Sequence, residues 1–575
     1  MRCFVLALAV FLPARAADHN RLLPRPQKIH YGAGRLELAG LSIRFTSAPN
    51  AEDRFAAGEL ASALSACAGT KIPLAEGAAK KSIVLNRTGS AAALPGLDER
   101  TGPDSRESYT IKVTPEGAEI RAHSSAGLFY GVQTMHQLTE GSGARASLPE
   151  VEIQDWPSVA YRGFMMETSH GPLPTEAEIK RQIDFLSHFK TNQYYFYSEL
   201  SIELKGYPLI NPGDARYAQE AVRRIIGYAH ARHVDVVPCL ELYGHLHDLF
   251  RIERHADLAP VPHGGEFNPR HPGVAPLLQD WIKQMAELFP SPLFHIGLDE
   301  TWELVRVASQ MAGGVDPGKL YIEHFLNVSN LVRQNGKRVM LWADILTRYP
   351  HLIPDLPKGT IAVPWAYSPQ KDFTRWVGPF AKAHVPMVVA SGITCYNEVV
   401  PDFYRSFSNI EGLLASGREN GALGLMNTGW ADDAQVIYRM SLPAMAFGSV
   451  APWQSVPVDR EHFFSDYARA LYPPAVAAEV APALEALAKS QQSFTRALGG
   501  QTMHRFWDDP LEPARLKRLR AHQEELHLGR LQAEEAAEHL YLALALKGDP
   551  ATLSSLLLGA RMLEWPRRTT VFWPT

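Results

Sequence analysis

The chain has 575 residues, which is too long for one hydrophobic core, so we expect about two to four domains. Its 57 basic and 61 acidic side chains nearly balance, which gives no reason to expect a nucleic acid or an anionic membrane surface as partner. A small neutral substrate suits this balance better.

The segment MRCFVLALAVFLPARA at residues 1–16 is typical of a secretory signal. It has a basic start, an apolar stretch from Cys3 to Leu12, and small residues at the cleavage position near Ala16. We therefore expect this segment to be removed and the protein to be exported, to the periplasm or the extracellular space. No later run approaches the ~20 apolar residues that a membrane-spanning helix needs, so we expect no membrane span.

Residues 21–157 are predicted to form a small α+β domain. Extended segments such as LSIRF, SIVLN, SYTIKV and AEIRAHS alternate with helical segments such as AEDRFAAGELASALSACAG and SAGLFYGVQTMHQLT. The segment EIQDWPSVAYRG then marks a junction, because Pro157 interrupts any regular element.

Residues 158–455 repeat a pattern of strand, loop and helix, which predicts a (β/α)8 barrel. The expected strands are YRGFMM, NQYYFY, VDVVPCLE, LFHIGL, RVMLWAD, TIAVPW, PMVVAS and ALGLMN. Thr175 and Glu178 form a capping box at the start of one connecting helix, with apolar residues at helical spacing behind it. A doubly wound open sheet is the alternative fold.

Residues 456–575 are rich in Ala, Leu and Glu and are predicted to be a helical C-terminal region beside the barrel; we assign its charge runs no function.

The acid pair Asp299-Glu300 directly follows the strand-like segment SPLFHIGL, which in turn follows the amphipathic helical segment VAPLLQDWIKQMAELF. A second copy of the letters GLDE, at Gly96 to Glu99, lies among Ala, Pro, Gly and charged residues, which predicts a solvated turn. Only the first copy has the context of an active site in an α/β barrel, namely acids at the carboxyl end of a strand.

Acids and aromatic residues dominate the carboxyl ends of the predicted strands, where a barrel of this kind places its chemistry. These residues are Glu167, His170, Ser198, Glu199, Glu241, His245, Asp299, Glu300, Trp342, Asp344, Trp365, Tyr367, Tyr396, Trp430, Asp432 and Asp433. Aromatic faces cover the apolar face of a sugar ring, and acids take its hydroxyl groups and supply a proton to a glycosidic oxygen. The combination therefore favours a carbohydrate substrate.

The segment His295-Ile296-Gly297-Leu298-Asp299-Glu300 resembles the His-x-Gly-Gly-Asp-Glu signature of glycoside hydrolase family 20, the β-N-acetylhexosaminidases. Further segments match in order over the first domain and the barrel: LFYGVQTMHQL, YRGFMMETSH and PCLELYGH. YGHLHDLF, EFNP, WADIL and NTGW look closer to the hexosaminidase D-like branch.

The resemblance implies a retaining mechanism in which the 2-acetamido group of the substrate is the nucleophile and forms an oxazolinium intermediate. Glu300 would protonate the departing oxygen and later deprotonate water, and Asp299 would orient the acetamido N–H and stabilise the intermediate. Neighbouring residues on a strand point to opposite faces, so both acids can share one pocket only if the strand has ended or bent by Asp299.

The resemblance also implies a set of residues that bind the sugar. Arg162 would hold the 3- and 4-hydroxyls, His245 would lie near the acid, Glu199 would be the second-strand acid, and Asp432 would take a hydroxyl at the far end of the ring. The acetamido pocket would be formed by Trp342, Trp365, Trp430 and Tyr396. Two of these have structural alternatives: Arg162 as an ion pair that closes the barrel floor, and His245 as a hydrogen-bonded core histidine.

The sequence departs from the family at METSH, where Glu167 and His170 stand in place of Asp and Arg, and at Cys239, where an acid is common. These departures leave the preference between gluco and galacto sugars open. Linkage, exo or endo action and oligomeric state are open too, although the resemblance favours removal of single terminal sugars.

Three rival functions remain at this stage. His245-x-His247 with Asp248 has a spacing that binds zinc, which would suit a metal-dependent barrel hydrolase, although we expect neither a metal nor any other cofactor. A sugar-binding protein on a degenerate barrel is the second rival. A glycosidase with Glu300 as acid and Glu199 as nucleophile is the third.

Overall fold

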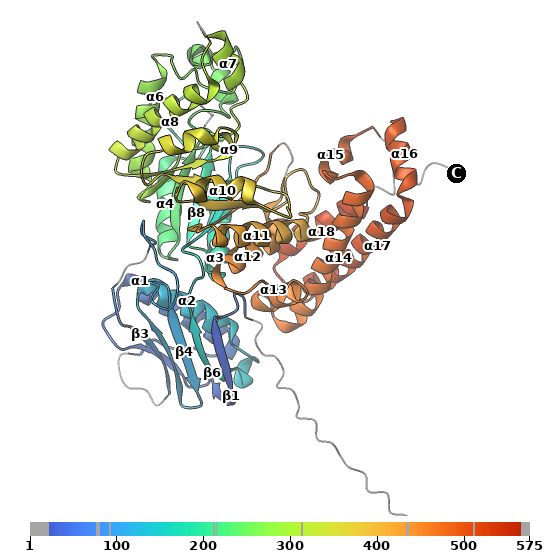
Figure 1. The fold of residues 1–575 in the computed structure, drawn as a ribbon. Helices are drawn as coiled ribbons and strands as arrows, with labels where there is room; N and C mark the ends of the chain where they lie inside the picture. Colours follow the sequence, from blue (N-terminus) through green and yellow to red (C-terminus); the bar gives the residue numbers. More distant parts are fainter. Residues whose placement is uncertain are drawn as a thin grey trace, which may run out of the picture.

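The computed structural model describes residues 22–75, 81–90, 94–210, 213, 215–311, 314–432, 436–509 and 512–564. The expected secretory signal lies outside these residues. Figure 1 shows three regions in chain order: a sheet with two helices, a barrel above it, and a group of helices at the side. Among the described residues, no helix combines the length and the apolar character that crossing a membrane requires.

The first region is a six-stranded mixed sheet with two helices. In spatial order its strands are β1 (Lys28–Glu37), β6 (Ser147–Asp155), β4 (Tyr109–Thr114), β5 (Gly117–Ala122), β3 (Ser82–Arg87) and β2 (Ser42–Phe45). The helices α1 (Ala51–Ala68) and α2 (Ser125–Gln137) lie on the side of the sheet that faces the barrel (Figure 1). There the ring of Phe129 in α2 lies 5.2 Å from the ring of His233. The predicted α+β domain is therefore present.

The second region is the predicted barrel of eight parallel strands. They are β7 (Tyr161–Glu167), β8 (Gln193–Ser198), β9 (Asp235–Leu240), β10 (Leu293–His295), β11 (Arg338–Trp342), β12 (Ile361–Val363), β13 (Val388–Gly392) and β14 (Gly424–Gly429). Neighbouring strands pair in the order β12-β11-β10-β9-β8-β7-β14-β13, and the parallel bridges Ala362–Met387 and Trp365–Ala390 close the ring between β12 and β13. The alternative of an open sheet is wrong.

Helices surround the barrel strands, and all eight predicted strand segments coincide with observed strands. The longer helices are α3 (Glu176–His188), α4 (Gln219–His230), α6 (Val274–Leu288), α8 (Pro317–Gln334), α10 (Thr374–Lys382), α11 (Phe403–Glu419) and α12 (Leu442–Trp453). Short helices are α5 (His247–Phe250), α7 (Leu304–Gln310) and α9 (Asp344–Arg348), with 3-10 turns at Glu253–Leu258, Pro350–Asp355 and Tyr438–Ser441; a further 3-10 turn, Gly143–Arg145, belongs to the first region. At the start of α3, the Thr175 side chain accepts the amide of Glu178 as predicted, but the Glu178 carboxylate accepts from Arg181 and Arg439 in place of the reciprocal bond of a capping box. The apolar residues behind the cap are buried, as expected.

The third region is helical, as predicted. It contains α13 (Phe463–Leu471), α14 (Pro474–Leu498), α15 (Thr502–Trp507), α16 (Pro513–Ala521), α17 (Gln523–Ala545) and α18 (Pro550–Glu564). Its buried side chains belong to the same apolar cluster as the outer layer of the barrel. The buried carboxylate of Glu398, on the loop after β13, accepts hydrogen bonds from Gln491 in α14 and Thr502 in α15. These helices therefore pack on the barrel as part of one core.

Candidate active site

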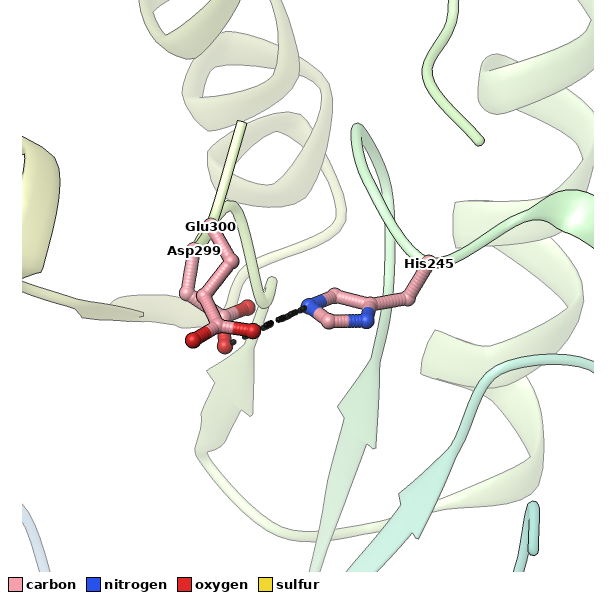
Figure 2. A group of neighbouring side chains, drawn as sticks. All are labelled: His245, Asp299 and Glu300. Carbon is pink, nitrogen blue, oxygen red and sulfur yellow. Dashed lines mark ion pairs between the residues drawn. The ribbon is translucent and has the colours of Figure 1, made fainter. Parts of the chain in front are cut away.

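The acid pair lies where the chain leaves β10 in a series of left-handed turns. The strand ends at His295, and the backbone φ angles are +69° at Gly297, +74° at Leu298 and +48° at Glu300. Glycine is needed at 297, because a Cβ there would lie 2.0 Å from a carboxylate oxygen of Glu241. The bend removes the strand alternation, and both acids point to the same side (Figure 2).

Three buried contacts from neighbouring elements hold this bend. The amide of Leu298 donates to the Glu241 carboxylate at the end of β9 (3.2 Å), and its carbonyl accepts the hydroxyl of Tyr321 in α8 (3.2 Å). The amide of Glu300 donates to the Asp344 carboxylate at the start of α9 (3.0 Å). Glu241 and Asp344 thus position the acids. Their sequence positions predicted that they lie at strand ends, but not this role.

His245 joins the two acids into one electrostatic group. Its Nε2 lies 3.6 Å from Asp299 Oδ2 and 3.8 Å from Glu300 Oε2 (Figure 2), and no described residue gives this nitrogen a hydrogen bond. Burial opposes the charged ring, but the carboxylates of Asp299, Glu241 and Glu199 outweigh it and raise the pKa of His245 to about 11. The alternative of a hydrogen-bonded core histidine does not describe this ring.

The two acids differ in their access to solvent. The Asp299 side chain is 9% exposed and that of Glu300 is 34% exposed, so one lies deep in the site and the other near its mouth. Burial and the Asp299 carboxylate raise the pKa of Glu300, while the His245 cation opposes the rise. Glu300 therefore keeps its proton to higher pH than an ordinary glutamate, as a general acid requires.

Aromatic side chains at the ends of five strands form a continuous wall. Ring centroids lie 4.9 Å apart for Tyr197–Trp430 and Trp365–Tyr367, 6.0 Å for Trp342–Trp430, 6.3 Å for Tyr367–Tyr396 and 6.4 Å for Tyr367–Trp430. The structure thus brings together the four aromatic residues predicted for the acetamido pocket and Tyr367, which was expected at a strand end, and adds Tyr197.

Several buried polar atoms at this wall have no hydrogen-bond partner among the residues that the structure describes. They are the indole nitrogens of Trp342, Trp365 and Trp430, and Asp299 Oδ1. Buried donors and acceptors are nearly always satisfied, so atoms left open beside a carboxylate pair mark positions for ligand groups. Trp342 itself is fully buried and supports the wall from below, with its ring 4.4 Å from that of His295.

Glu199 and Asp432 lie beside this group. The hydroxyl of Tyr197 donates to Glu199 (3.3 Å), and burial raises the pKa of Glu199 to about 7. Asp432 is half-buried with a φ of +44°, and its charge acts on both Glu300 and His170. Asp433 lies outside the described residues.

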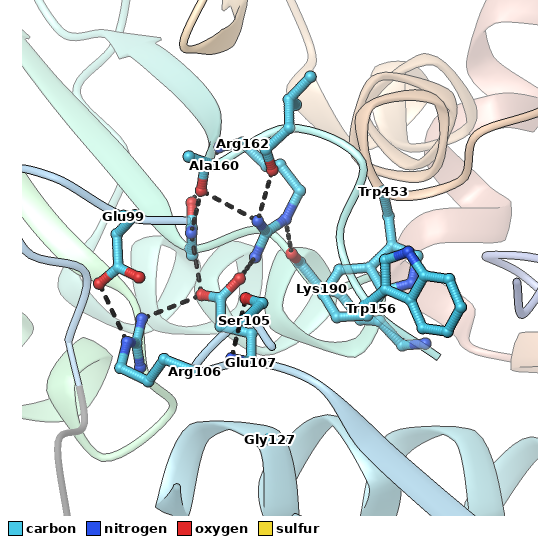
Figure 3. Close-up of polar contacts among 12 residues, drawn as sticks. Glu99, Ser105, Arg106, Glu107, Gly127, Trp156, Ala160, Arg162, Lys190 and Trp453 are labelled. Atoms are coloured by element: carbon cyan, nitrogen blue, oxygen red, sulfur yellow. Dashed lines mark hydrogen bonds and ion pairs between the residues drawn. The ribbon is translucent and has the colours of Figure 1, made fainter. Parts of the chain in front are cut away.

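Arg162 is not in the site, and its expected role in sugar binding is a correction. It lies at the amino end of β7 and is 0% exposed. Its guanidinium donates to Glu107 at 2.5 Å and to the carbonyls of Lys190, Val159 and Ala160 (Figure 3), so the donors face the barrel floor and are already used. The structural alternative, an ion pair closing the floor, is the observed arrangement.

His170 places a cation at the opposite, carboxyl end of the same strand. Its Nδ1 lies 3.0 Å from Glu167 Oε1 and its Nε2 lies 3.9 Å from Glu199 Oε1. The hydrogen bond with Glu167 is the main cause that raises the pKa of His170 to about 9, so the ring is charged near neutral pH. Its strand-end position was the sequence signal for it, but the resemblance drew attention to Arg162 instead.

The zinc-binding arrangement of the metal-dependent rival does not assemble. His247 and Asp248 are exposed on α5, and Asp248 pairs with Arg251 at 2.7 Å. Among the described residues, the one group with metal-like spacing is His245, Asp299 and Glu300, whose ligand atoms lie within 4.8 Å of one another. That group is the acid pair and its histidine, and the expected absence of a metal stays a prediction.

Comparisons with known proteins match this geometry over most of the chain. Residues 19–156 match "Glycosyl hydrolase family 20, domain 2", and residues 159–403 match "Glycosyl hydrolase family 20, catalytic domain". The chain belongs to glycoside hydrolase family 20. Its closer likeness to the hexosaminidase D-like branch stays a prediction.

Named relatives are similar over part of their length. A β-hexosaminidase of Porphyromonas gingivalis is 30% identical over 42% of this chain and 36% of its own length. One of Akkermansia muciniphila is 23% identical over 56% of this chain and 72% of its own length. The match thus spans about a third of the first relative and under three quarters of the second.

Solved structures of the family share the fold. A Streptomyces plicatus N-acetyl-β-hexosaminidase superposes with a TM-score of 0.64 at 21% identity, over 81% of this chain and 97% of that one. A Flavobacterium johnsoniae chitobiase superposes with a TM-score of 0.65 at 18% identity, over 96% of this chain and 92% of that one. At these identities the likeness shows the fold alone.

Proposed function

We propose that this member of family 20 is a retaining β-N-acetylhexosaminidase that releases terminal N-acetylglucosamine or N-acetylgalactosamine. The observation that carries the proposal is the bend after β10, which turns Asp299 and Glu300 toward one aromatic-walled site. Relatives with the printed name β-hexosaminidase support it.

The unsatisfied acceptor on Asp299 fits a substrate that carries its own amide. Asp299 Oδ1 accepts the acetamido N–H, which turns the carbonyl oxygen toward the anomeric carbon. As that oxygen forms its bond to the carbon, Glu300 gives its proton to the departing glycosidic oxygen and the glycosidic bond breaks. Water then attacks the anomeric carbon of the oxazolinium ion, the bond from that carbon to the acetamido oxygen breaks, and Glu300 takes the proton from the attacking water.

The other side chains of the site have binding roles in this proposal. Trp365, Trp430 and Tyr396 surround the acetamido group, with Trp342 supporting them. His170 and Asp432 take hydroxyls at the far end of the ring, since His170 is the charged donor at this end of β7. Glu199 lies 3.9 Å from Nε2 of His170, and its charge adds to those of Glu167 and Asp299 in favouring the charged forms of His170 and His245. Action on single terminal sugars and export of the protein belong to the same proposal.

The test compares 4-nitrophenyl β-N-acetylglucosaminide, the corresponding N-acetylgalactosaminide and the plain β-glucoside. The wild type should hydrolyse only the acetamido sugars. Glu300→Gln should lose about 10²–10⁴-fold in kcat because it removes the general acid, and Asp299→Asn about 10²–10³-fold because it weakens stabilisation of the intermediate.

The second GLDE copy supplies the matched control. Its residues 97–98 form an exposed turn, as predicted, and the Asp98 side chain is 97% exposed. Asp98→Asn should therefore leave kcat unchanged. A wild type that prefers the plain glucoside would favour Glu199 as an enzymic nucleophile, and saturable sugar binding without turnover would favour the sugar-binding protein.

A further inference from the structure

Trp302 lies two residues after the catalytic acid and is mostly open to solvent. Its side chain is 67% exposed, and it is the one tryptophan among the described side chains that is not at least half-buried. Two consecutive peptide units span at most about 7 Å, so its Cα lies at the mouth of the site beside Glu300. An indole that exposed leaves most of its apolar surface in water, where a ligand can cover it.

The turn that presents Trp302 is fixed on both sides. Thr301 is 1% exposed, so the residue before the indole is buried. On the other side, the amide of Glu303 donates to the carboxylate of Glu266 (2.6 Å), and Glu303 Oε1 accepts the amide of Gly265 (3.1 Å). The exposure of Trp302 is therefore a property of an anchored turn and not of a loose loop.

One cation lies over the indole. The guanidinium carbon of Arg348, in the last turn of α9, is 5.8 Å from the centre of the ring. The same short helix begins at Asp344, which holds the amide of Glu300. Helix α9 thus supports the catalytic acid through Asp344 and also carries Arg348, which forms a platform with Trp302.

We propose that Trp302, with Arg348 beside it, binds the sugar residue on the leaving-group side of the scissile bond. This inference rests on the proposed function. Glu300 protonates the oxygen of the departing group, so that group must leave the site past Glu300, where Trp302 stands. A pyranose ring offers an apolar face for the indole and hydroxyls for the five donors of a guanidinium. The substrate class is then an oligosaccharide in which the terminal acetamido sugar is β-linked to a second sugar.

Two substrates with similar alkoxide leaving groups test this. One is the β-1,4-linked disaccharide of N-acetylglucosamine, and the other is methyl β-N-acetylglucosaminide, which has no second sugar. Trp302→Ala should lower kcat/KM about 2- to 13-fold on the disaccharide, because the stacking contact with the second sugar is lost, and leave it unchanged on the methyl glycoside. Trp302→Phe should keep most of the activity on the disaccharide, and Arg348→Gln should lose less than Trp302→Ala.

The outcomes separate the two claims. If Trp302→Ala lost activity equally on both substrates, or on neither, the platform would be overturned. Wild-type activity on the methyl glycoside would still uphold the proposed function. A wild type that hydrolyses neither acetamido substrate removes the proposed function and the platform together.

Discussion

His245 is the cation that the two acids of the site share. It contacts both carboxylates, and its own charge is maintained by Asp299, Glu241 and Glu199. A cation in this position lowers the pKa of Glu300 and so limits the rise that burial and Asp299 cause. The histidine thereby sets the pH at which the acid loses its proton.

Replacing His245 with Gln should move the basic limb of the kcat/KM profile to higher pH. The acid works only while protonated, so activity falls as pH rises through the pKa of Glu300, and removal of the cation raises that pKa. The variant should also lose up to about a hundredfold at its optimum, because the two acids lose a shared positioning contact. A profile with an unmoved basic limb would show that His245 does not act on the acid.

At the residue scale, the sequence predicted the positions of the acids and of the aromatic wall, but the wrong residue, Arg162, was expected to be the cation in the site. Asp299, Glu300 and the tryptophans follow strands that the hydrophobic pattern marks, so their common end could be predicted. Arg162 precedes the apolar part of β7 and His170 follows it, and the position along the strand decides which face of the barrel each reaches. Position along the strand would therefore have favoured His170 over Arg162 as the cation that binds the sugar.

At the element scale, β7 has a different task at each end. Its carboxyl end carries Glu167, which binds the amides of Ser169, His170 and Ala431 and so shapes the site. Its amino end carries Arg162, which binds the first domain. One strand therefore separates stability from chemistry, as is usual for this fold.

Variants at the two ends of β7 should therefore change different quantities: those at the amino end the stability, and those at the carboxyl end KM. Glu107→Gln leaves the Arg162 guanidinium buried without a counter-charge, which should cost about 3–5 kcal/mol of unfolding free energy and leave KM unchanged. Arg162→Met should also leave KM unchanged. His170→Gln should raise KM for the chromogenic N-acetylglucosaminide with little change in the thermal unfolding midpoint. A higher KM for Arg162→Met at an unchanged midpoint would restore its role in sugar binding.

Strands and helices were predictable because their periodicity is local, but the contacts between loops were not. The carboxylate of Glu266 meets the amide of Glu303 from a loop that follows a different strand. Nothing in either segment specifies the partner, since the barrel alone brings the two loops together. The same holds for Asp344, whose contact with the amide of Glu300 depends on where α9 begins.

For the whole molecule, buried ionisable groups should limit stability on both sides of neutrality. Burial raises the pKa of Glu199 and Asp344 to about 7 and that of Glu266 to about 8. Their folded pKa values exceed the unfolded values of ~4, so this contribution is lost progressively as pH rises from there through the folded values of about 7 to about 8. Burial lowers the pKa of His188 to about 3 and that of His324 to about 4, so their contribution is lost as pH falls below the unfolded value of ~6.5.

The thermal unfolding midpoint should therefore be highest in mildly acidic to neutral buffer and fall toward both about pH 4 and about pH 9. Glu266→Gln removes one of the carboxyl groups that must ionise, so its midpoint should fall less on the alkaline side and match the wild type near pH 5. A variant with the same alkaline slope as the wild type would contradict this account of Glu266.

The floor of the barrel joins two domains through charges that neither domain balances alone. Arg162 and Lys190 belong to the barrel, whereas their partners Glu107 and Asp155 come from the preceding sheet, and all four are buried (Figure 3 shows the Arg162 side). A recombination event that exchanged the first domain would have to supply both acids at the same spacing. In this protein the first domain and the barrel are thus a matched pair, because exchange of either one alone would leave buried charges without their partners.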